Sequence, residues 1–193
     1  DDSLYVRRSV ANHLNDIAKD HPELVLDTCL AWQQELTTSH TNETAFSDEK
    51  IEEVNWVIRH ATRTLVKAGH PKIFKLLGYT ESPKIKVLAL VIEQSSITGE
   101  ETLSFNIALE NAKKTTQKFV LDYAIHFVKA NRERKPKVFK LKNCELAASS
   151  QLKVSKKYSF KKISTRKYYG GEHLVELFIN GQSVASANFN YSL

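Results

Sequence analysis

Two segments of the sequence repeat arginine, aromatic and polar side chains at intervals of three to four residues. In chain order these residues are Tyr5, Arg8, Asn12, Asp16, Trp56, Arg59, Arg63 and Lys67. Arginine binds phosphate oxygens through its planar guanidinium, and such contacts position a protein on nucleic acid. The set contains four cations, an aromatic edge and a single carboxylate. Its chemistry is therefore that of a phosphate-binding surface with one acid.

Such a surface requires helices that present these residues on one side. Apolar residues spaced three and four apart predict helices over 3–20, 23–36 and 49–68, and a short helix over 71–77. Pro22 and Pro71 fit the first turn of a helix, and Gly69 fits a helix end. Residues 37–47 are rich in Ser, Thr and Asn, and we expect a loop there.

The apolar stripes of the first and third helices lie opposite the polar ones on a helical wheel. We expect them to form the core, and they consist of Val6, Val10, Leu14, Ile17, Val57, Ala61, Leu65 and Ala68. Two interpretations of the polar stripe stay open, a DNA-binding surface and an ordinary solvated face. Trp56 also has two possible places, on that surface or in the core.

The helical half contains an internal repeat. Residues 5–10 align with residues 56–61, Leu14 aligns with Leu65, and each segment closes on His-Pro. A helical unit of about 50 residues is close to the HEAT period, and fewer than three such repeats are not stable alone. We therefore expect further repeats before this segment and interpret the chain as the C-terminal portion of a longer protein.

Beyond Pro83 the pattern changes to short alternating segments. They predict strands over 84–92, 102–109, 119–128, 138–141, 152–160, 174–179 and 183–191. Asn180-Gly181 is a strong signal for a type I′ hairpin turn. The predicted fold is a two-domain α + β chain, with HEAT-like repeats in 1–79, a linker at 80–83 and an immunoglobulin-like β-sandwich in 84–193.

Charge divides at the same place. Residues 1–83 hold 9 Lys and Arg against 13 Asp and Glu, a net charge of −4, and residues 84–193 hold 19 against 9, a net charge of +10. The basic residues of the second half cluster in predicted turns. Contact of loops at one end of the sandwich with DNA is one explanation, and charge that keeps strand edges apart is the other.

Other chemistry has little support in the sequence. Metal-binding and nucleotide-binding motifs are absent, so we expect no cofactor and no metal site. Cys29 and Cys144 lie in different predicted domains, which favours a reducing, cytoplasmic location over a disulfide. No apolar run reaches 18 residues, which argues against a membrane span.

Specific runs resemble the AlkC branch of the DNA alkylation-repair family. The first half matches the last HEAT-like repeats of that branch in Tyr5–Pro22 (YVRRSVANHLNDIAKDHP), Trp56–Leu65 (WVIRHATRTL) and Gly69–Pro71 (GHP). The second half resembles the immunoglobulin-like domain that follows them, in its Asp122-Tyr123 pair, in 126–130 (HFVKA), in 136–141 (PKVFKL) and in 168–173 (YYGGEH). The resemblance covers nearly the whole chain.

This resemblance implies a monomeric DNA glycosylase that removes cationic alkylated bases, such as 3-methyladenine, from double-stranded DNA. Such a base is a good leaving group, so the enzyme mainly has to hold the duplex and stabilise an oxocarbenium-like sugar. Asp16 is the candidate catalytic carboxylate, and a solvated Asp in the last helical turn is the alternative. The candidate DNA-binding residues are Arg8, Asn12, Trp56, Arg59, His60, Arg63 and Lys67. Since upstream repeats are expected, the intact protein is predicted to be the glycosylase and this chain alone a weak DNA binder.

Two rival functions stay open. One is an adaptor of HEAT-like repeats and a sandwich that binds a protein partner, which predicts an apolar groove in place of the cationic stripe. The other is a lesion sensor that binds DNA without chemistry.

Overall fold

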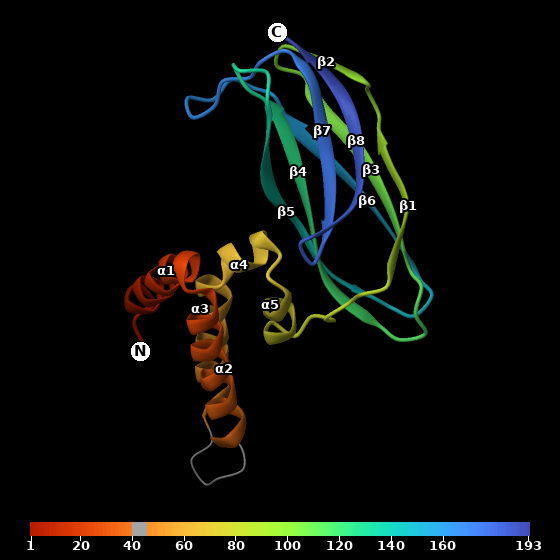
Figure 1. Cartoon of the computed structure of the whole chain (residues 1–193). Coiled ribbons are helices and arrows are strands. Elements are labelled where there is room, and N and C mark those ends of the chain that lie inside the picture. Colours follow the sequence, from red (N-terminus) through yellow and green to blue (C-terminus); the bar gives the residue numbers. More distant parts are fainter. Residues whose placement is uncertain (40–45) are drawn as a thin grey trace. The chain divides into compact units, whose positions relative to one another are not determined.

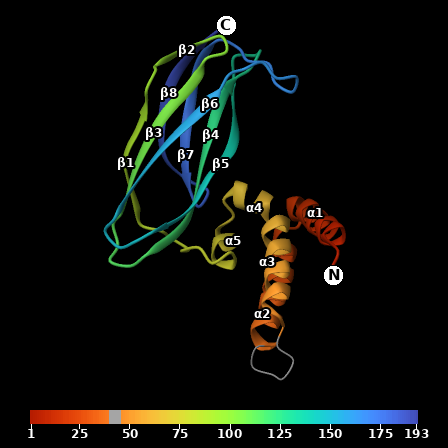
Figure 2. The same ribbon diagram turned by 180° about the vertical axis from the view of Figure 1, so that it is seen from behind.

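The computed structural model describes residues 1–39 and 46–193 and shows helices followed by strands (Figure 1). The chain divides into two compact units, Asp1–Glu81 and Ser82–Leu193, and the division falls inside the 80–83 segment. The view from behind shows the same order, with helices in the first half of the chain and strands in the second (Figure 2). The fold class predicted from the sequence is confirmed.

The helices of the first unit begin and end near the predicted residues. They are α1 (Leu4–Asp20), α2 (Pro22–Ser39), α3 (Asp48–Ala61), α4 (Arg63–Ala68) and α5 (Pro71–Leu76). Gly69 ends α4 in the left-handed conformation with a φ of 69°, which glycine adopts without steric cost. The predicted loop over 37–47 was partly wrong, because α2 continues to Ser39; residues 40–45 lie outside the described part.

A break at Thr62 divides the predicted long helix into α3 and α4. Thr62 is fully buried, and its hydroxyl donates a hydrogen bond to the carbonyl oxygen of Ile58 at 2.7 Å. A threonine hydroxyl bonded four residues back bends a helix. Asn15 of α1 then caps the new helix, since its Oδ1 accepts from the backbone N–H of Thr64 at 3.2 Å and from the Thr64 hydroxyl at 2.8 Å.

The buried face of α1 matches the predicted one only in part, since Leu14 packs against the core and Ile17 is half-buried. Ala11, Asn15 and Ala18 are buried, whereas Val6 and Val10 are 37% and 41% exposed. The buried side of α1 carries small residues because α1 packs closely against α3, with Ala11 in one cluster with Val57 and Ala61. In α3 and α4 the prediction is confirmed for the residues Val57, Ala61 and Leu65 and wrong for Ala68, which is exposed.

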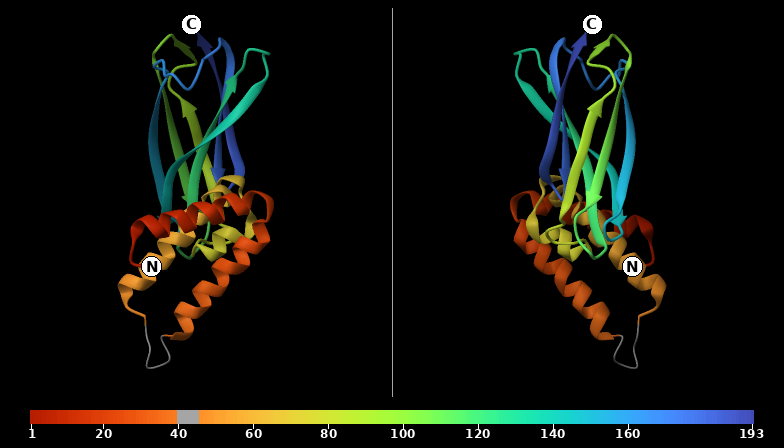
Figure 3. Two further views of the ribbon diagram at one scale, coloured as in Figure 1. Left: turned by 90° about the vertical axis from the view of Figure 1, so that its left-hand side faces the viewer. Right: turned by 90° about the vertical axis from the view of Figure 1, so that its right-hand side faces the viewer.

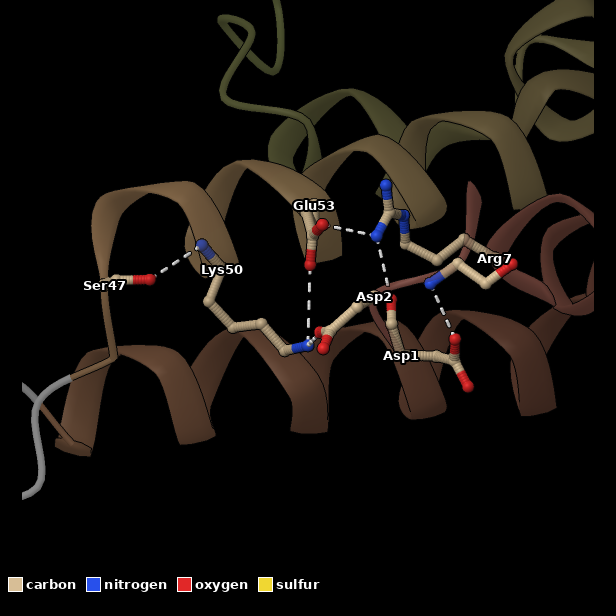
Figure 4. Close-up of polar contacts among 7 residues, drawn as sticks. Asp1, Asp2, Arg7, Ser47, Lys50 and Glu53 are labelled. Carbon is tan, nitrogen blue, oxygen red and sulfur yellow. Dashed lines mark hydrogen bonds and ion pairs between the residues drawn. The ribbon is translucent and has the colours of Figure 1, made fainter. Parts of the chain in front are cut away.

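Polar contacts join the first turns of α1 and α3 (Figure 4). Arg7 pairs with Glu53, and only 16% and 18% of these two side chains is exposed. Lys50 contacts the other oxygen of Glu53 at 3.4 Å and Asp2 at 3.5 Å, and Ser47 accepts a hydrogen bond from the Lys50 N–H at 3.2 Å. Arg7 is therefore committed to holding the two helices together, while its neighbour Arg8 is exposed.

The second unit is a sandwich of two sheets, seen from two sides in Figure 3. Its strands are β1 (Ile85–Ile92), β2 (Ser96–Thr98), β3 (Thr102–Asn111), β4 (Gln117–Val128), β5 (Arg134–Leu146), β6 (Gln151–Ser159), β7 (Gly171–Ile179) and β8 (Gln182–Ser192). One sheet has the order β1-β3-β6 and the other the order β2-β8-β7-β4-β5. All neighbours are antiparallel except β2 and β8.

The predicted strands are all present, with two differences. Strand β2 was not predicted, and β5 is much longer than the predicted 138–141. Its extra residues include Pro136 and several lysines, which a central strand would not tolerate, but β5 lies at a sheet edge. The predicted turn between β7 and β8 is confirmed, since Asn180 and Gly181 have φ values of 46° and 71°.

Aromatic side chains fill much of the space between the sheets. Phe160 lies at the centre, with its ring centroid 4.6 Å from that of Tyr191 and 4.9 Å from that of Tyr168. Phe105 and Phe119 are also fully buried in this core. Contacts between aromatic rings thus make up the centre of the sandwich core.

Candidate nucleic-acid interface

A hydrogen bond between α1 and α4 joins the two polar stripes. The Arg63 guanidinium donates to Oδ1 of Asn12 at 3.1 Å and to the carbonyl oxygen of His60 at 2.7 Å. The break at Thr62 and the cap from Asn15 set the start of α4, and so they position Arg63 toward α1. Residues 51 positions apart in the sequence thereby share one surface.

His60 lies between the cations of this surface. Burial lowers its pKa below the ordinary value, and the positive charges of Arg63 and Arg8 lower the pKa further. The imidazole is therefore neutral at pH 7 and stacks on the Trp56 indole, with centroids 4.9 Å apart and planes at 10°. Trp56 also packs against the cluster around Ala11. Trp56 is thus a half-buried support for His60.

Asp16 lies one helical turn beyond Asn12 on α1. It pairs with Lys19 at 2.7 Å, and both side chains are exposed. The hydrogen bond and charge of Lys19 hold the pKa of Asp16 below its ordinary value, and the charges of Arg63 and His13 lower the pKa further. Asp16 is therefore ionised at neutral pH and could stabilise a positive charge on a bound ligand.

The structure brings together most of the predicted residues, but not all of them. Arg8, Asn12, Asp16, His60 and Arg63 are connected by the contacts and charge effects described above. Arg59 instead pairs with Glu52 at 3.4 Å and lines a hollow that also includes Gln33 of α2 and Leu76 of α5.

Lys67 is exposed on α4, and the structure gives it no link to the other residues of this set. Reasoning from the sequence missed Lys19 and His13. Their spacing of three residues on either side of Asp16 was the available signal, because residues three apart on a helix are neighbours.

An apolar hollow of about 310 Å³ lies elsewhere on the helical unit. Val6 and Val10 of α1 line it, together with Trp32, Leu36 and Val54. Positions 6 and 10 project from α1 roughly opposite to positions 8 and 12, because each residue turns a helix by about 100°. The adaptor hypothesis predicts an apolar groove in place of the cationic stripe. This hollow lies on the other side of α1, so it does not replace the stripe.

Many cations of the sandwich lie along its strands, and others lie in the turns and loops at its two ends. Lys113 and Lys114 belong to the β3–β4 turn at one end. At the other end, the β4–β5 turn and the β6–β7 loop contain Lys129, Arg132, Lys161, Lys162, Arg166 and Lys167. More of the loop cations therefore lie at the β4–β5 end than at the β3–β4 end.

Other kinds of site have no support in the part of the chain that the structure describes. No group of three His, Cys, Asp or Glu side chains is arranged to hold a metal there. None of the described helices is long and apolar enough to cross a bilayer. Both Cys29 and Cys144 are buried free thiols, and burial raises the pKa of Cys29 to about 11, so it is unreactive at neutral pH.

Comparisons with known proteins agree on one relationship. Residues 86–192 match the family described as "Uncharacterised protein YhaZ, C-terminal Ig-like domain". The chain is 36% identical over 189 residues to protein YhaZ of Bacillus subtilis (strain 168), a match that covers 98% of this chain and 48% of YhaZ.

A solved structure agrees with this match. It is the Pseudomonas fluorescens alkylpurine DNA glycosylase AlkC bound to DNA containing an abasic site analog, with a TM-score of 0.87 and 36% identity over 99% of this chain and 49% of AlkC. A β-glucosidase from Erythrobacter marinus matches 56% of this chain and 15% of its own, at 15% identity and a TM-score of 0.50, which reflects fold alone. The chain spans about half the length of YhaZ and AlkC.

Proposed function

Because this chain belongs to the YhaZ family and is of the AlkC type of DNA alkylation-repair protein, we propose that it holds duplex DNA for base excision. The reaction is hydrolysis of the N-glycosidic bond of cationic alkylated bases such as 3-methyladenine, carried out by the intact protein. The observation that carries the proposal is the hydrogen bond between Arg63 and Asn12, which joins α1 and α4 into one cationic surface beside Asp16.

DNA binding by this surface follows from its charges. Arg8 is exposed, and Arg63 is held in place by two hydrogen bonds, so both guanidinium groups can reach phosphate oxygens. His60 is neutral and stacked, which lets it donate a hydrogen bond to the backbone without adding to the repulsion between the arginines. Asn12 contributes an amide N–H₂, because its oxygen is already bonded to Arg63.

The chemical step needs little help from acid or base groups. A cationic base leaves with its bonding electrons and becomes neutral, and the positive charge moves to the sugar. Asp16 is ionised at neutral pH, so its carboxylate can stabilise that charge until water adds to the sugar carbon and loses a proton. Lys19 competes for Asp16 in the free protein. A DNA phosphate that binds Lys19 would release the carboxylate for this role.

The proposal also covers how the helices and domains of the protein are organised. In this proposal the helices α1–α2 and α3–α5 are two HEAT-like repeats: α1 packs against α3 and α4, and α2 packs against α5 as well as against α3. This first-to-first and second-to-second packing is typical of a solenoid. The proposed domains are residues 1–79 and 84–193, with a linker at 80–83. We propose that the protein acts as a monomer. The free buried thiols fit a cytoplasmic location. The basic sandwich contacts the same duplex.

Substitution of Asp16 tests the proposal in the intact enzyme. Asp16→Asn keeps the size of the side chain and removes its charge, and we expect single-turnover excision of 3-methyladenine to fall by roughly 100-fold or more. The matched control is Asp20→Asn, which makes the same change one helical turn further along, at an exposed position. DNA affinity is measured in parallel. Equal excision rates for the two variants would exclude a catalytic role for Asp16.

The same assay separates the glycosylase from a lesion sensor. If the unsubstituted intact protein binds the alkylated duplex and releases no free base, it is a sensor. If it binds no DNA, the cationic surface is an ordinary solvated face.

A further inference from the structure

A basic hollow of about 660 Å³ lies at the β4–β5 end of the sandwich. Its lining residues belong to the β4–β5 turn, the start of β5 and the loop before β7. Figure 1 shows where these segments lie in the sandwich. Five cations line it, together with an aromatic residue: Lys129, Lys135, Lys137, Arg166, Lys167 and Tyr169. No Asp or Glu is among the residues that line it.

Among the residues that the structure describes, the four lysines of this basic hollow have no carboxylate partner. Ion pairs elsewhere on the sandwich, such as Arg134 with Glu172 at 3.5 Å, do not involve them. Like charges gathered in a hollow repel each other, and this repulsion is relieved when an anion binds among them. The arrangement therefore favours a negatively charged ligand.

The walls of the basic hollow are held by contacts that do not depend on a ligand. The Arg166 guanidinium lies over the Phe127 ring, 4.8 Å from its centroid, and donates a hydrogen bond to the Tyr158 hydroxyl. Arg132 donates to the carbonyl oxygen of Gly170 at 3.3 Å, which ties the β4–β5 turn to the β6–β7 loop. Arg166 is thus a positioning residue, and the lysines are presented from a preorganised frame.

The shape of the basic hollow suits an extended polyanion. Lys135, Lys137 and Lys167 are exposed, so the hollow is open to solvent along β5. Lys135 and Lys137 point to the same side of the strand and are separated by about 7 Å along it. Phosphates of one DNA strand follow each other at a rise of about 3.4 Å along the duplex axis and lie further apart through space, because the backbone winds around that axis. Two lysines about 7 Å apart can therefore each contact one of two neighbouring phosphates of the same strand.

We propose that the basic hollow binds consecutive phosphates of a DNA backbone, independently of the base sequence and of the lesion. The inference rests on the proposed function, and it assigns the DNA contact of the sandwich to one site. Lysines act there as point charges, and Tyr169 is placed to donate a hydrogen bond from its hydroxyl.

The test compares two double variants of the 193-residue chain with equal loss of charge. Lys135→Gln/Lys137→Gln changes the basic hollow, and Lys113→Gln/Lys114→Gln changes exposed lysines at the opposite end of the sandwich. Binding to an undamaged duplex is measured by fluorescence anisotropy between 50 and 200 mM salt, in about four steps. Thermal melting shows whether each variant remains folded.

For the variant in the basic hollow, we expect the slope of log binding constant against log salt concentration to decrease in magnitude by about two. Each lysine contact to a phosphate contributes about one to this slope. The control should keep the slope of the unsubstituted chain. Equal slopes for the two variants would overturn the proposal, and so would an unsubstituted chain that does not bind DNA at 50 mM salt, about the low end of the usual range.

Two further readouts identify the ligand and separate the two proposals. Inorganic phosphate is titrated against the chain by NMR; if phosphate shifts the Lys135 and Lys137 signals and duplex DNA does not, the hollow is a site for a small anion and the proposal is wrong. Excision by the intact protein is scored separately. If the unsubstituted intact protein excises no base, and Lys135→Gln/Lys137→Gln still lowers the salt dependence of DNA binding, then the proposed glycosylase activity is wrong. The proposed DNA site in the basic hollow is then still supported.

Discussion

The helical unit and the sandwich both expose cations, but they surround them differently. In the helical unit several cations pair with carboxylates, as in Lys19 with Asp16, Arg59 with Glu52 and Lys72 with Glu23. In the sandwich the lysines of the basic hollow pair with none. The net charge of a unit therefore does not predict the charge on any one of its surfaces. The helical unit has a net charge of −4 and still presents Arg8 and Arg63 on one surface, and acids such as Glu53 and Glu23 lie in ion pairs away from it.

The two units also differ in what holds them together. The sandwich has a large core in which aromatic rings contact one another around Phe160. Among the described residues, the core between α1 and α3 is much smaller and has no fully buried ring: Ala11, Val57 and Ala61 form it, and Leu14, Trp32 and Trp56 are only partly buried against it. Polar bridges such as Arg7 to Glu53 supplement this core. Truncation of an aromatic ring should therefore affect the sandwich most, and loss of a bridge should affect the helices.

The largest expected effect is on the cores. Phe160→Ala should lower the free energy of unfolding of the sandwich by about 3–5 kcal/mol, because it removes a fully buried ring. Val57→Ala should cost the helical unit only about 2 kcal/mol. Both tryptophans, Trp32 and Trp56, lie in the helical unit, so urea unfolding followed by tryptophan fluorescence reports on that unit and circular dichroism reports on both. Equal losses would contradict the difference between the two cores.

A smaller effect is expected for ion pairs. Arg7→Gln should destabilise the helical unit by about 1–2 kcal/mol, because the largely buried Glu53 then keeps only its longer contact with Lys50 at 3.4 Å. The comparison in the sandwich is Arg134→Gln, whose pair with Glu172 is exposed, and we expect a loss below about 0.5 kcal/mol. The same urea experiment measures both. A larger loss for Arg134→Gln would mean that burial does not decide the value of these pairs.

The smallest effect concerns two histidines with lowered pKa values. Burial is the main cause for both, and the charges of Arg63 and Arg8 add to it at His60. Since the unfolded chain takes up these protons more readily, stability should decrease as the pH falls below the ordinary histidine pKa of about 6.5. His173 is fully buried, so its substitution should remove more of this acid sensitivity.

DNA should distinguish the two histidines. Bound phosphates would neutralise the charges around His60 and raise its pKa, whereas His173 lies inside the sandwich core and should not respond. NMR titration with and without duplex DNA measures both values. A His60 pKa that DNA leaves unchanged would argue against phosphate binding beside Arg8 and Arg63.

Much of the fold could be predicted from local signals in the sequence. Pro22 and Pro71 mark the starts of helices, Gly69 marks the end of one, and Asn180-Gly181 marks a hairpin, because each residue restricts or permits particular backbone angles. The buried face of α1 could be predicted only in part in this way. Periodicity identifies the most apolar face, and close packing against α3 instead selected the face with the smallest side chains.

The candidate sites show the same division. The sequence by itself determined that arginines, an asparagine and one aspartate recur at helical spacing, and that positive charge gathers beyond Pro83. Only the tertiary structure decided that Arg63 reaches Asn12 while Arg59 turns to Glu52. It also brought a turn, an edge strand and a loop together around one basic hollow. Spacing along the chain is fixed by local geometry, but contacts between distant residues depend on where a helix breaks and how loops are tied, and those are properties of the packed molecule.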